Sequence, residues 1–572
     1  MSKKLLLTIC LLATTIFMAS AQSSWQWGKR GGSSDAGFGG PDESVVDMAT
    51  DQHGNIYVLS TVLQTGFNID GHAVAEWGGY DVSISSFKCD GSYRWSKTIG
   101  GSGDDHGMAL RTDTLGGVYV TGYLATHFIT IHIDADSAWF TGTSYKSFYV
   151  AKFDTAGTYK WFRMPQADTV GITAYSFTGP LDMDVDGAGN IDILSLLPPG
   201  VFGGSYVVSG GVGVHMLRYD RYGNFTGGMP MQITVSGIDP PLKMKRDHRS
   251  GRYYVTGAKA YTGGTLSFGS TPITHPLFIG AFDNSGTLLW NRQSTTSYGG
   301  NFGRAAIDDT GNIYLACGTG NGDTFNGFTV VNTITSIPYG GPFIVKIDSA
   351  GTNKWGMYGS TNAATGGTTV TLNGNIVSIA GEYPGRLIWP GYSDTLSLPG
   401  GSLTHIFITR FDAGSGSVIN VDTLESATGY HTNAMALASD NLGNFYVGGD
   451  FESTITVNGT TLNSAGGGSD FFIAKYGTSN CSGGTLEAPP GLTKGEDVLR
   501  VYPNPARDEL VIENAVGGSA VKLLNMMGQV MYESSISGDY QVISTKNLVN
   551  GMYVFQVTDV ACNRTIKTIV KQ

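Results

Sequence analysis

Short apolar runs of strand length recur along the chain and alternate with polar turns that are rich in glycine. The most regular run reads Asp-x-x-Gly-Asn-Ile-Tyr-Val, and its full and weaker copies lie at residues 51–58, 113–120, 186–191, 249–255, 308–314, 372–376 and 440–446. Their turn glycines are Gly54, Gly116, Gly189, Gly251, Gly311, Gly374 and Gly443. Asp accepts a hydrogen bond from the backbone two residues further on, and glycine supplies a positive φ. Each copy therefore predicts a tight turn that leads into a β-strand.

A second pattern follows each copy of the first and reads Phe-Ile-Ala-Lys-Tyr-Asp-x-x-Gly-x-x-x-Trp in its fullest form. It occurs at residues 148–161, 278–290 and 343–355, in shorter forms at 86–95, 216–225 and 407–419, and without its Trp at 471–476. Segments such as residues 455–462 predict a small hairpin around Asn-Gly. Each repeat therefore predicts a four-stranded antiparallel meander with an extra hairpin.

The two ends of the repeat array predict how it closes. The seventh repeat stops after Tyr476 without its Trp-containing strand, whereas residues 22–28 form such a strand with no repeat before it. One meander cannot bury both of its faces, but seven can if they pack radially as the blades of a propeller. We therefore expect an all-β fold, with a seven-bladed β-propeller over residues 22–477 that the N-terminal strand closes.

These repeats resemble the bacterial β-propeller repeat family that carries the pattern Gly-Asn-x-Tyr followed by Lys-x-Asp-x-x-Gly-x-x-x-Trp. The resemblance covers roughly residues 23–477. It implies the same propeller fold.

The first 21 residues have the pattern of a signal peptide. Lys3 and Lys4 precede an apolar run at residues 5–17, and Ala19-Ser20-Ala21 fits a cleavage site. No later stretch approaches the ~18 apolar residues of a membrane-spanning helix. We expect an exported chain without a membrane span.

The C-terminal part has a different character from the repeats. Residues 478–496 are rich in Gly, Ser, Thr and Pro and predict a linker. Short alternating strands follow within residues 497–572 and predict a small, Ig-like β-sandwich. This part resembles the C-terminal sorting domain of type IX secretion substrates in its Pro-Asn-Pro form, and the matching residues are Pro503, Asn504, Pro505, Gly528, Gly551 and Tyr553. The resemblance implies handling by the type IX secretion machinery, removal of the tail, and release or display at the outer cell surface.

Composition excludes several classes of partner and site. The formal net charge is −11, which argues against nucleic acid and anionic membrane surfaces. Cys89, Cys317, Cys481 and Cys562 show no zinc-ligand spacing and do not form a disulfide-rich scaffold, although their pairing stays open. Glycine accounts for 83 of 572 residues, about twice the usual ~7%, as expected for many tight turns.

No compact catalytic motif is present, and we expect no metal or cofactor. Asp182-x-Asp184-x-Asp186 begins like a calcium loop, but its twelfth position is Ile193 instead of Glu. Calcium therefore remains only an alternative. His127 and His132 near two Asp residues fit a strand surface better than a metal site.

A basic residue recurs near the end of the third strand in six repeats. These residues are Lys88, Lys152, Arg218, Lys346, Arg410 and Lys475. Residues that every repeat shares usually build the repeat, so structural pairing is favoured over a ring of ligand contacts.

Candidate ligand contacts lie in loops that differ between repeats. Asp104, Asp105 and His106 precede the first strand of the second repeat, and Trp77, Trp139 and Trp389 follow second strands. Exposed aromatic rings could stack on sugars, and Trp77 is the best candidate, whereas Trp389 aligns with a hairpin strand and should be buried. The alternative is that all three rings pack inside the extra hairpins.

We expect a monomeric, non-enzymatic secreted or surface module that binds a glycan or a protein. A polysaccharide hydrolase or lyase and a structural surface protein are the alternatives. Ionisable residues that converge at the channel mouth would favour the enzyme, and sequence alone cannot show such convergence.

Overall fold

The computed structural model describes most of the chain apart from its N-terminus, the linker and several loops. The described residues are 23–33, 43–63, 66–125, 129–133, 136–140, 147–165, 179–236, 242–258, 264–295, 303–334, 340–362, 369–397, 404–426, 431–465, 468–478, 481, 500–502, 506, 508–513, 519–525, 529–536, 540–558 and 564–571. The chain divides into two compact units, Met1–Cys481 and Ser482–Gln572. The first unit thus extends to Cys481, beyond the expected end at Gly477.

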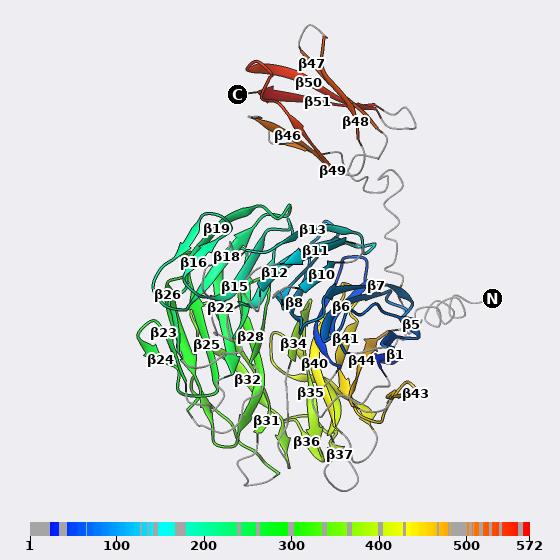
Figure 1. Ribbon diagram of the computed structural model, residues 1–572. Helices are drawn as coiled ribbons and strands as arrows, with labels where there is room; N and C mark the ends of the chain where they lie inside the picture. Colours follow the sequence, from blue (N-terminus) through cyan, green and yellow to red (C-terminus); the bar gives the residue numbers. More distant parts are fainter. Residues whose placement is uncertain are drawn as a thin grey trace, which may run out of the picture. The chain divides into compact units, whose positions relative to one another are not determined.

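Seven antiparallel sheets in the first unit share one strand order (Figure 1). Their four strands, from inner to outer edge, are β2 (Val45–Thr50), β3 (Ile56–Leu63), β6 (Tyr80–Phe87) and β7 (Tyr93–Gly100); β8 (His106–Thr112), β9 (Gly117–Leu124), β12 (Ser147–Asp154) and β13 (Tyr159–Arg163); β14 (Gly179–Val185), β15 (Ile191–Leu197), β18 (Gly213–Tyr219) and β19 (Phe225–Pro230); β21 (Leu242–Asp247), β22 (Arg252–Ala258), β25 (Leu277–Phe282) and β26 (Leu288–Gln293); β27 (Arg304–Ile307), β28 (Ile313–Gly320), β31 (Gly340–Ile347) and β32 (Asn353–Tyr358); β34 (Thr369–Asn373), β35 (Ile376–Pro384), β38 (Thr404–Asp412) and β39 (Val418–Ser426); β40 (Thr432–Ser439), β41 (Phe445–Phe451), β44 (Asp470–Gly477) and β1 (Ser24–Gly32).

The innermost strands contact one another in cyclic order. β2 contacts β8, and the series continues through β14, β21, β27, β34 and β40 back to β2. Hydrophobic side chains of neighbouring sheets pack together, so that central strands such as β15 and β44 are buried along their whole length. The unit is therefore all-β and propeller-like.

The extra hairpins add short strands outside these four. They are β4 (Asn68–Ile69) and β5 (His72–Ala73); β10 (Ile129–Ile133) and β11 (Asp136–Phe140); β16 (Gly200–Phe202) and β17 (Tyr206–Val208); β23 (Thr265–Phe268) and β24 (Thr271–Pro272), paired with β20 (Ile233–Ser236); β29 (Thr324–Phe325) and β30 (Phe328–Thr329); β36 (Arg386–Ile388) and β37 (Leu396–Ser397), paired with β33 (Ser360–Thr361); β42 (Thr454–Val457) and β43 (Thr460–Asn463). Asn458 and Gly459 both have positive φ, which confirms the predicted Asn-Gly turn.

The repeated Asp caps its turn, as the sequence predicted. One carboxylate oxygen of Asp51 accepts hydrogen bonds from the backbone N–H groups of His53 and Asn55, both at 2.9 Å. The other oxygen accepts the hydroxyl of Tyr57 at 2.8 Å, which explains the Tyr in the motif. All seven turn glycines have positive φ, for example 74° at Gly54.

The N-terminal strand completes the seventh sheet, which confirms the predicted pairing. β1 runs antiparallel to β44, with Trp27 opposite Lys475 and Lys29 opposite Ile473. Trp25 is buried and its ring packs edge-on against Tyr476 with centroids 5.1 Å apart. The first and last strands of this unit therefore share one sheet.

A Trp on the outer strand of one sheet connects it to the next sheet. In five cases the indole N–H donates to a backbone carbonyl of the neighbouring turn: Trp27 to Cys89 at 2.9 Å, Trp95 to Thr155 at 3.0 Å, Trp161 to Arg221 at 3.0 Å, Trp290 to Ser349 at 3.0 Å and Trp355 to Ala413 at 3.2 Å. The glycine of the turn between the third and fourth strands of the neighbouring sheet lies against the ring. For example, a Cβ at Gly157, between β12 and β13, would come within 2.6 Å of Trp95. The Asp-x-x-Gly turn and the Trp therefore form one inter-sheet contact.

The recurring basic residue takes part in the same inter-sheet contact. Lys346 donates to the carbonyl of Ala413 at 2.8 Å and lies 4.9 Å from the ring centre of Tyr314. Lys152 likewise donates to the carbonyl of Arg221 at 3.2 Å. These contacts fit the structural reading of this position.

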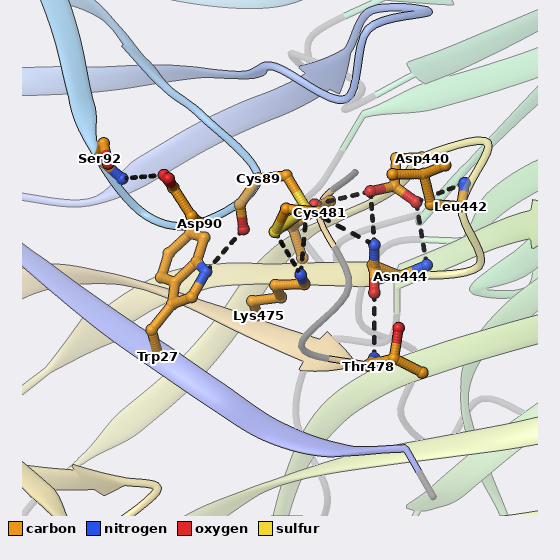
Figure 2. The surroundings of a disulfide bond; sticks show 11 residues. Trp27, Cys89, Asp90, Ser92, Asp440, Leu442, Asn444, Lys475, Thr478 and Cys481 are labelled. Carbon is orange, nitrogen blue, oxygen red and sulfur yellow. Dashed lines mark hydrogen bonds between the residues drawn. A yellow bond between two sulfur atoms is a disulfide. The ribbon is translucent and has the colours of Figure 1, made fainter. Parts of the chain in front are cut away.

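At the seventh sheet a disulfide stands beside the basic residue (Figure 2). Cys89, which follows β6, forms a disulfide with Cys481, which follows β44. The two cysteines are 392 residues apart in the sequence. The Lys475 ammonium lies 3.0 Å from the sulfur of Cys89 and 3.1 Å from that of Cys481. The disulfide therefore joins the first and seventh sheets covalently, and Cys317 is a buried free thiol.

The second unit contains two antiparallel sheets that share one hydrophobic core. One sheet contains β45 (Arg500–Tyr502), β46 (Glu509–Glu513) and β49 (Tyr540–Ser544), and the other contains β48 (Val530–Ser535), β47 (Ala520–Asn525), β50 (Gly551–Thr558) and β51 (Arg564–Lys571). Leu510, Leu523 and Phe555 are buried between them.

Candidate functional site

A cavity of about 430 Å³ lies where the innermost strands of all seven sheets meet. Residues of β2, β8, β14, β21, β27, β34 and β40 line it. We call this cavity the channel. Nine ionisable side chains converge on it: Asp47, Arg111, Asp182, Asp184, Lys243, Lys245, Arg246, His248 and Arg304.

Strand geometry explains this convergence. Alternate residues of a strand point to the same side, so Asp182 and Asp184 on β14, and Lys243 and Lys245 on β21, reach the channel in pairs. The charged residues come from the innermost strands β2, β8, β14, β21 and β27, apart from His248, which follows the end of β21 at Asp247. The two remaining strands, β34 and β40, contribute Thr, Val, Leu, Ala and Ser side chains to the lining.

Arg111 lies between two carboxylates. It contacts Asp47 at 2.5 Å and Asp182 at 2.8 Å. Asp182 also accepts the backbone N–H of Met244 at 2.8 Å. Burial alone would raise the pKa of Asp47, but Arg111 and the other nearby cations hold it at about 2.

Asp184 and His248 form a second pair. The imidazole Nε2 lies 2.6 Å from a carboxylate oxygen of Asp184, and this hydrogen bond raises the pKa of His248. The pKa of Asp184 is lowered, because His248 and Lys245 outweigh the effect of burial. Arg246 turns to Asp192 at 2.5 Å. All three channel carboxylates are thus paired with a basic side chain.

Three channel cations, Lys243, Lys245 and Arg304, have no carboxylate partner among the described residues that is as close as those of Arg111. Arg304 lies 3.9 Å from Asp47, and Lys243 makes a long contact of 3.4 Å with the carbonyl of Met108. Burial lowers the pKa of both Lys243 and Lys245, and the positive charges of nearby arginines add to this effect.

The loop residues singled out from the sequence lie together, but in different environments. Trp77 is 38% exposed and stacks on His132 with ring centroids 3.7 Å apart. Tyr80 links the two loops, because its N–H lies 3.4 Å from Asp104 and its ring lies 5.8 Å from that of His106. These loops therefore form a second, partly aromatic surface.

Asp105 does not belong to that exposed surface. It is fully buried, and its two oxygens accept the backbone N–H groups of Gly101 and Ala125, both at 2.7 Å. Burial and these two backbone hydrogen bonds do not favour its expected role as a ligand contact. Burial raises its pKa to about 7.

The other candidate residues lie in a buried hairpin, on β11 and in the C-terminal unit. Trp389 is 1% exposed and packs edge-on against Phe411, as its alignment with a hairpin strand suggested. The backbone of Trp139 lies on β11, whereas its side chain lies outside the described part, as do Pro503, Asn504, Pro505 and Gly528. Gly551 begins β50, and Tyr553 on that strand donates to the carbonyl of Val549 at 2.6 Å.

The start of the apparent calcium loop has other partners. Asp182 and Asp184 face the channel and form the ion pairs described above, whereas Asp186 caps its turn through the N–H groups of Ala188 and Asn190. No group of three or more His, Cys, Asp or Glu within the described residues is arranged to hold a metal ion.

Sequence reasoning missed the channel cluster. Its signal was present in the spacing Asp182-x-Asp184 and Lys243-x-Lys245, where charges occupy alternate positions of a first strand. That spacing places both residues on one face, but the side chains that they meet come from other sheets.

Comparisons with known proteins bear mainly on the tail. Residues 500–572 match the secretion system C-terminal sorting domain family. No curated protein matches the chain in sequence.

Several solved structures show a distant likeness to this chain. A protein of unknown function from Dyadobacter fermentans is 12% identical, with a TM-score of 0.33 over 65% of this chain and 95% of that chain. PorZ, a surface component of the type IX secretion system of Porphyromonas gingivalis, is 11% identical, with a TM-score of 0.18 over 92% and 81%. An ulvan lyase is 12% identical, with a TM-score of 0.31 over 71% and 94%.

The described residues include no helix that is long and apolar enough to cross a membrane. The sorting domain marks proteins that the type IX secretion system exports. This chain therefore carries a type IX sorting domain at its C-terminus and is delivered to the cell surface or secreted.

Proposed function

We propose that the first unit is a closed, seven-bladed β-propeller that binds a ligand in its channel and does not catalyse a reaction. Seven sheets of one strand order, cyclic contacts of the inner strands and the pairing of β1 with β44 support the closed ring. The second unit is then an Ig-like sandwich of the Pro-Asn-Pro type, removed after export. The mature protein is a monomeric surface or secreted module for a glycan or a protein.

The convergence of nine ionisable side chains on one cavity supports a functional site in the channel, and by the criterion stated above it fits catalysis as well as binding. A structural spacer would need no such cluster, because buried charges are costly unless they are paired. The cavity volume also lies within the ~300–1,000 Å³ of small-molecule sites.

The state of the carboxylates favours binding over glycoside hydrolysis. A hydrolase of the usual two-carboxylate type needs one carboxylic acid that stays protonated near neutral pH. The channel instead holds Asp47 and Asp184 with lowered pKa values, and Asp182 is bonded to Arg111.

A polysaccharide lyase is the second candidate, and one observation favours it. The imidazole of His248 lies 2.6 Å from Asp184. Lys245, on the strand β21 that ends just before His248, has a lowered pKa. A base and an acid in one cavity could remove one proton and donate another.

Glycan-array binding of the full-length chain tests the proposal. Two variants that fill the channel, Ala49→Phe and Thr371→Phe, should abolish binding while thermal melting confirms folding. Trp77→Ala is the matched control on the loop surface and should leave binding intact. If only Trp77→Ala removes binding, the ligand sits on the loops and the channel proposal is wrong.

Incubation of the bound glycan with the protein separates binding from catalysis. New reducing ends or unsaturated sugar products would support the enzyme alternative instead. An array without any bound glycan, together with no bound surface protein, would favour the structural alternative.

A further inference from the structure

The channel lining is cationic although the protein is acidic overall. Five Lys and Arg residues face three Asp residues in the cavity, whereas the formal net charge of the chain is −11. A local reversal of charge in a confined site concentrates ligands of the opposite sign, because low-dielectric walls focus the field.

The excess of positive charge is confined to one part of the channel wall. Arg111 lies between Asp47 and Asp182, and Arg246 shares Asp192 with Arg218. Lys243 and Lys245 on β21 form no ion pair in the described part of the chain, and Arg304 on the adjacent β27 keeps only a long contact of 3.9 Å with Asp47. Arg304 lowers the pKa of Lys243, so these two charges repel each other, whereas Asp182 acts on the pKa of Lys243 in the opposite direction.

An anion that enters from solution would relieve this repulsion. Half-buried cations gain more from a counter-ion than exposed ones do, because water screens them less. Carboxylate and sulfate oxygens accept charge-assisted hydrogen bonds from ammonium and guanidinium groups. The cationic wall thus fits either of these two groups.

The wall formed by β34 and β40 fits the body of a sugar. β40 lies three sheets away from β21 in the cyclic order and contributes Leu437 and Ser439, and β34 contributes Thr369, Val370 and Thr371. Aliphatic groups beside hydroxyls suit a ring that has C–H faces and polar edges.

We infer that the channel binds an acidic sugar, whose carboxylate or sulfate group is held by Lys243, Lys245 and Arg304. The inference rests on the proposed function and names the ligand class of the same site. The sugar ring packs against the β34–β40 side of the channel. The cavity volume is near the lower limit for ligand sites, so the channel would hold one acidic sugar unit of a glycan at a time.

Calorimetric titration of the full-length chain tests this inference. The probes are glucuronate, a sulfated glucose, neutral glucose, acetate and inorganic sulfate. We expect at least one acidic sugar to bind and glucose to bind at least tenfold more weakly. Acetate and sulfate should also bind more weakly than the sugars that carry these groups. Comparing the two acidic sugars shows which group is recognised.

Charge-removing variants identify the residues. Lys245→Gln and Arg304→Gln should each weaken binding roughly 10- to 100-fold, the scale of one charge-assisted hydrogen bond. Lys354→Gln is the matched control, because it removes a cation from the outer strand β32 at a side chain that is 48% exposed. It should leave the affinity unchanged.

Three outcomes would overturn the inference. These are equal binding of glucose and the acidic sugars, no binding of either acidic sugar, and unchanged affinity in both charge variants. If Ala49→Phe abolishes binding but Lys245→Gln and Arg304→Gln do not, the channel still binds the ligand and only its acidic character is wrong. If Ala49→Phe has no effect, the proposed function itself fails.

Discussion

The indole N–H of Trp27 donates a 2.9 Å hydrogen bond to the backbone carbonyl of Cys89, which joins the N-terminal strand to the first sheet. Its ring also covers Gly91, where a Cβ would approach to 2.9 Å. The same contact recurs between other neighbouring sheets. Trp27 therefore connects the seventh sheet to the first sheet in the way that the other tryptophans connect consecutive sheets. Its disruption should therefore weaken closure of the whole ring.

Deletion of residues 22–30 should sharply lower the melting temperature. The deletion removes most of β1, buried Trp25 and the Trp27 contact, and it exposes the edge of β44. Thermal unfolding followed by circular dichroism measures the loss. An unchanged melting temperature would contradict closure by the N-terminal strand. Trp77→Ala serves as the control, because Trp77 is 38% exposed.

Replacement of both disulfide cysteines should destabilise the first unit. Cys89→Ser with Cys481→Ser should cost about 2–5 kcal/mol in the free energy of unfolding, since the bond closes a very long loop. Guanidinium denaturation measures this free energy. Reductant should destabilise the parent protein but not the double variant, and an equal response of both would argue against the disulfide.

Asp81→Asn should stabilise the protein at neutral and alkaline pH. Burial, with Asp105 adding to it, raises the pKa of Asp81 to about 8, above its ordinary value of 3.8. The folded state therefore holds this proton more tightly than the unfolded chain, and stability falls as pH rises from about 4 to about 8. Melting temperatures across this range should be flatter in the variant.

Asp105→Asn is the matched comparison for Asp81→Asn. Both oxygens of Asp105 accept backbone N–H groups, so an amide NH₂ would face a donor. Asp81 uses one oxygen to accept the N–H of Trp77 at 2.6 Å, and its other oxygen has no hydrogen-bond partner among the described residues. Asp105→Asn should thus destabilise, and stabilisation by both variants would contradict this account.

The tryptophans of the hairpin loops should differ in their contribution to stability. Trp389→Ala should cost about 3–5 kcal/mol, the scale for removal of a buried aromatic side chain. Trp77→Ala should cost much less, because its ring is partly exposed and stacks on one His. Equal losses in thermal melts would show that Trp77 is also part of the core.

A chain that ends after Ser482 should fold but remain in the periplasm. The first unit keeps all its sheets and Cys481, whereas the sorting domain at residues 500–572 is lost. Cell fractionation measures its location against the full-length chain. Normal surface delivery would contradict the role of the tail. A chain that ends at Gly477 would lose the disulfide as well, so it is not an equivalent test.

Much of the fold follows from the sequence because its determinants are local and repeated. Asp51 and Gly54 define a turn through bonds within a few residues, and Tyr57 reinforces it. Seven such turns set the period of the sheets. The seventh repeat lacks a Trp strand after Tyr476, and the N-terminal segment that contains Trp27 is a Trp strand with no repeat before it. The sorting domain was also readable, since several of its residues occur in a fixed order.

Tertiary structure alone decided the site and the covalent closure. Asp47, Arg111 and Arg304 are far apart in the chain, and they meet only because the inner strands of successive sheets converge on one cavity. Cys89 finds Cys481 for the same reason, after the ring brings the first and seventh sheets together. Local patterns fix strands and turns through short-range hydrogen bonds. The partner of a charge or a thiol depends on which distant strands the packing of the sheets places beside it.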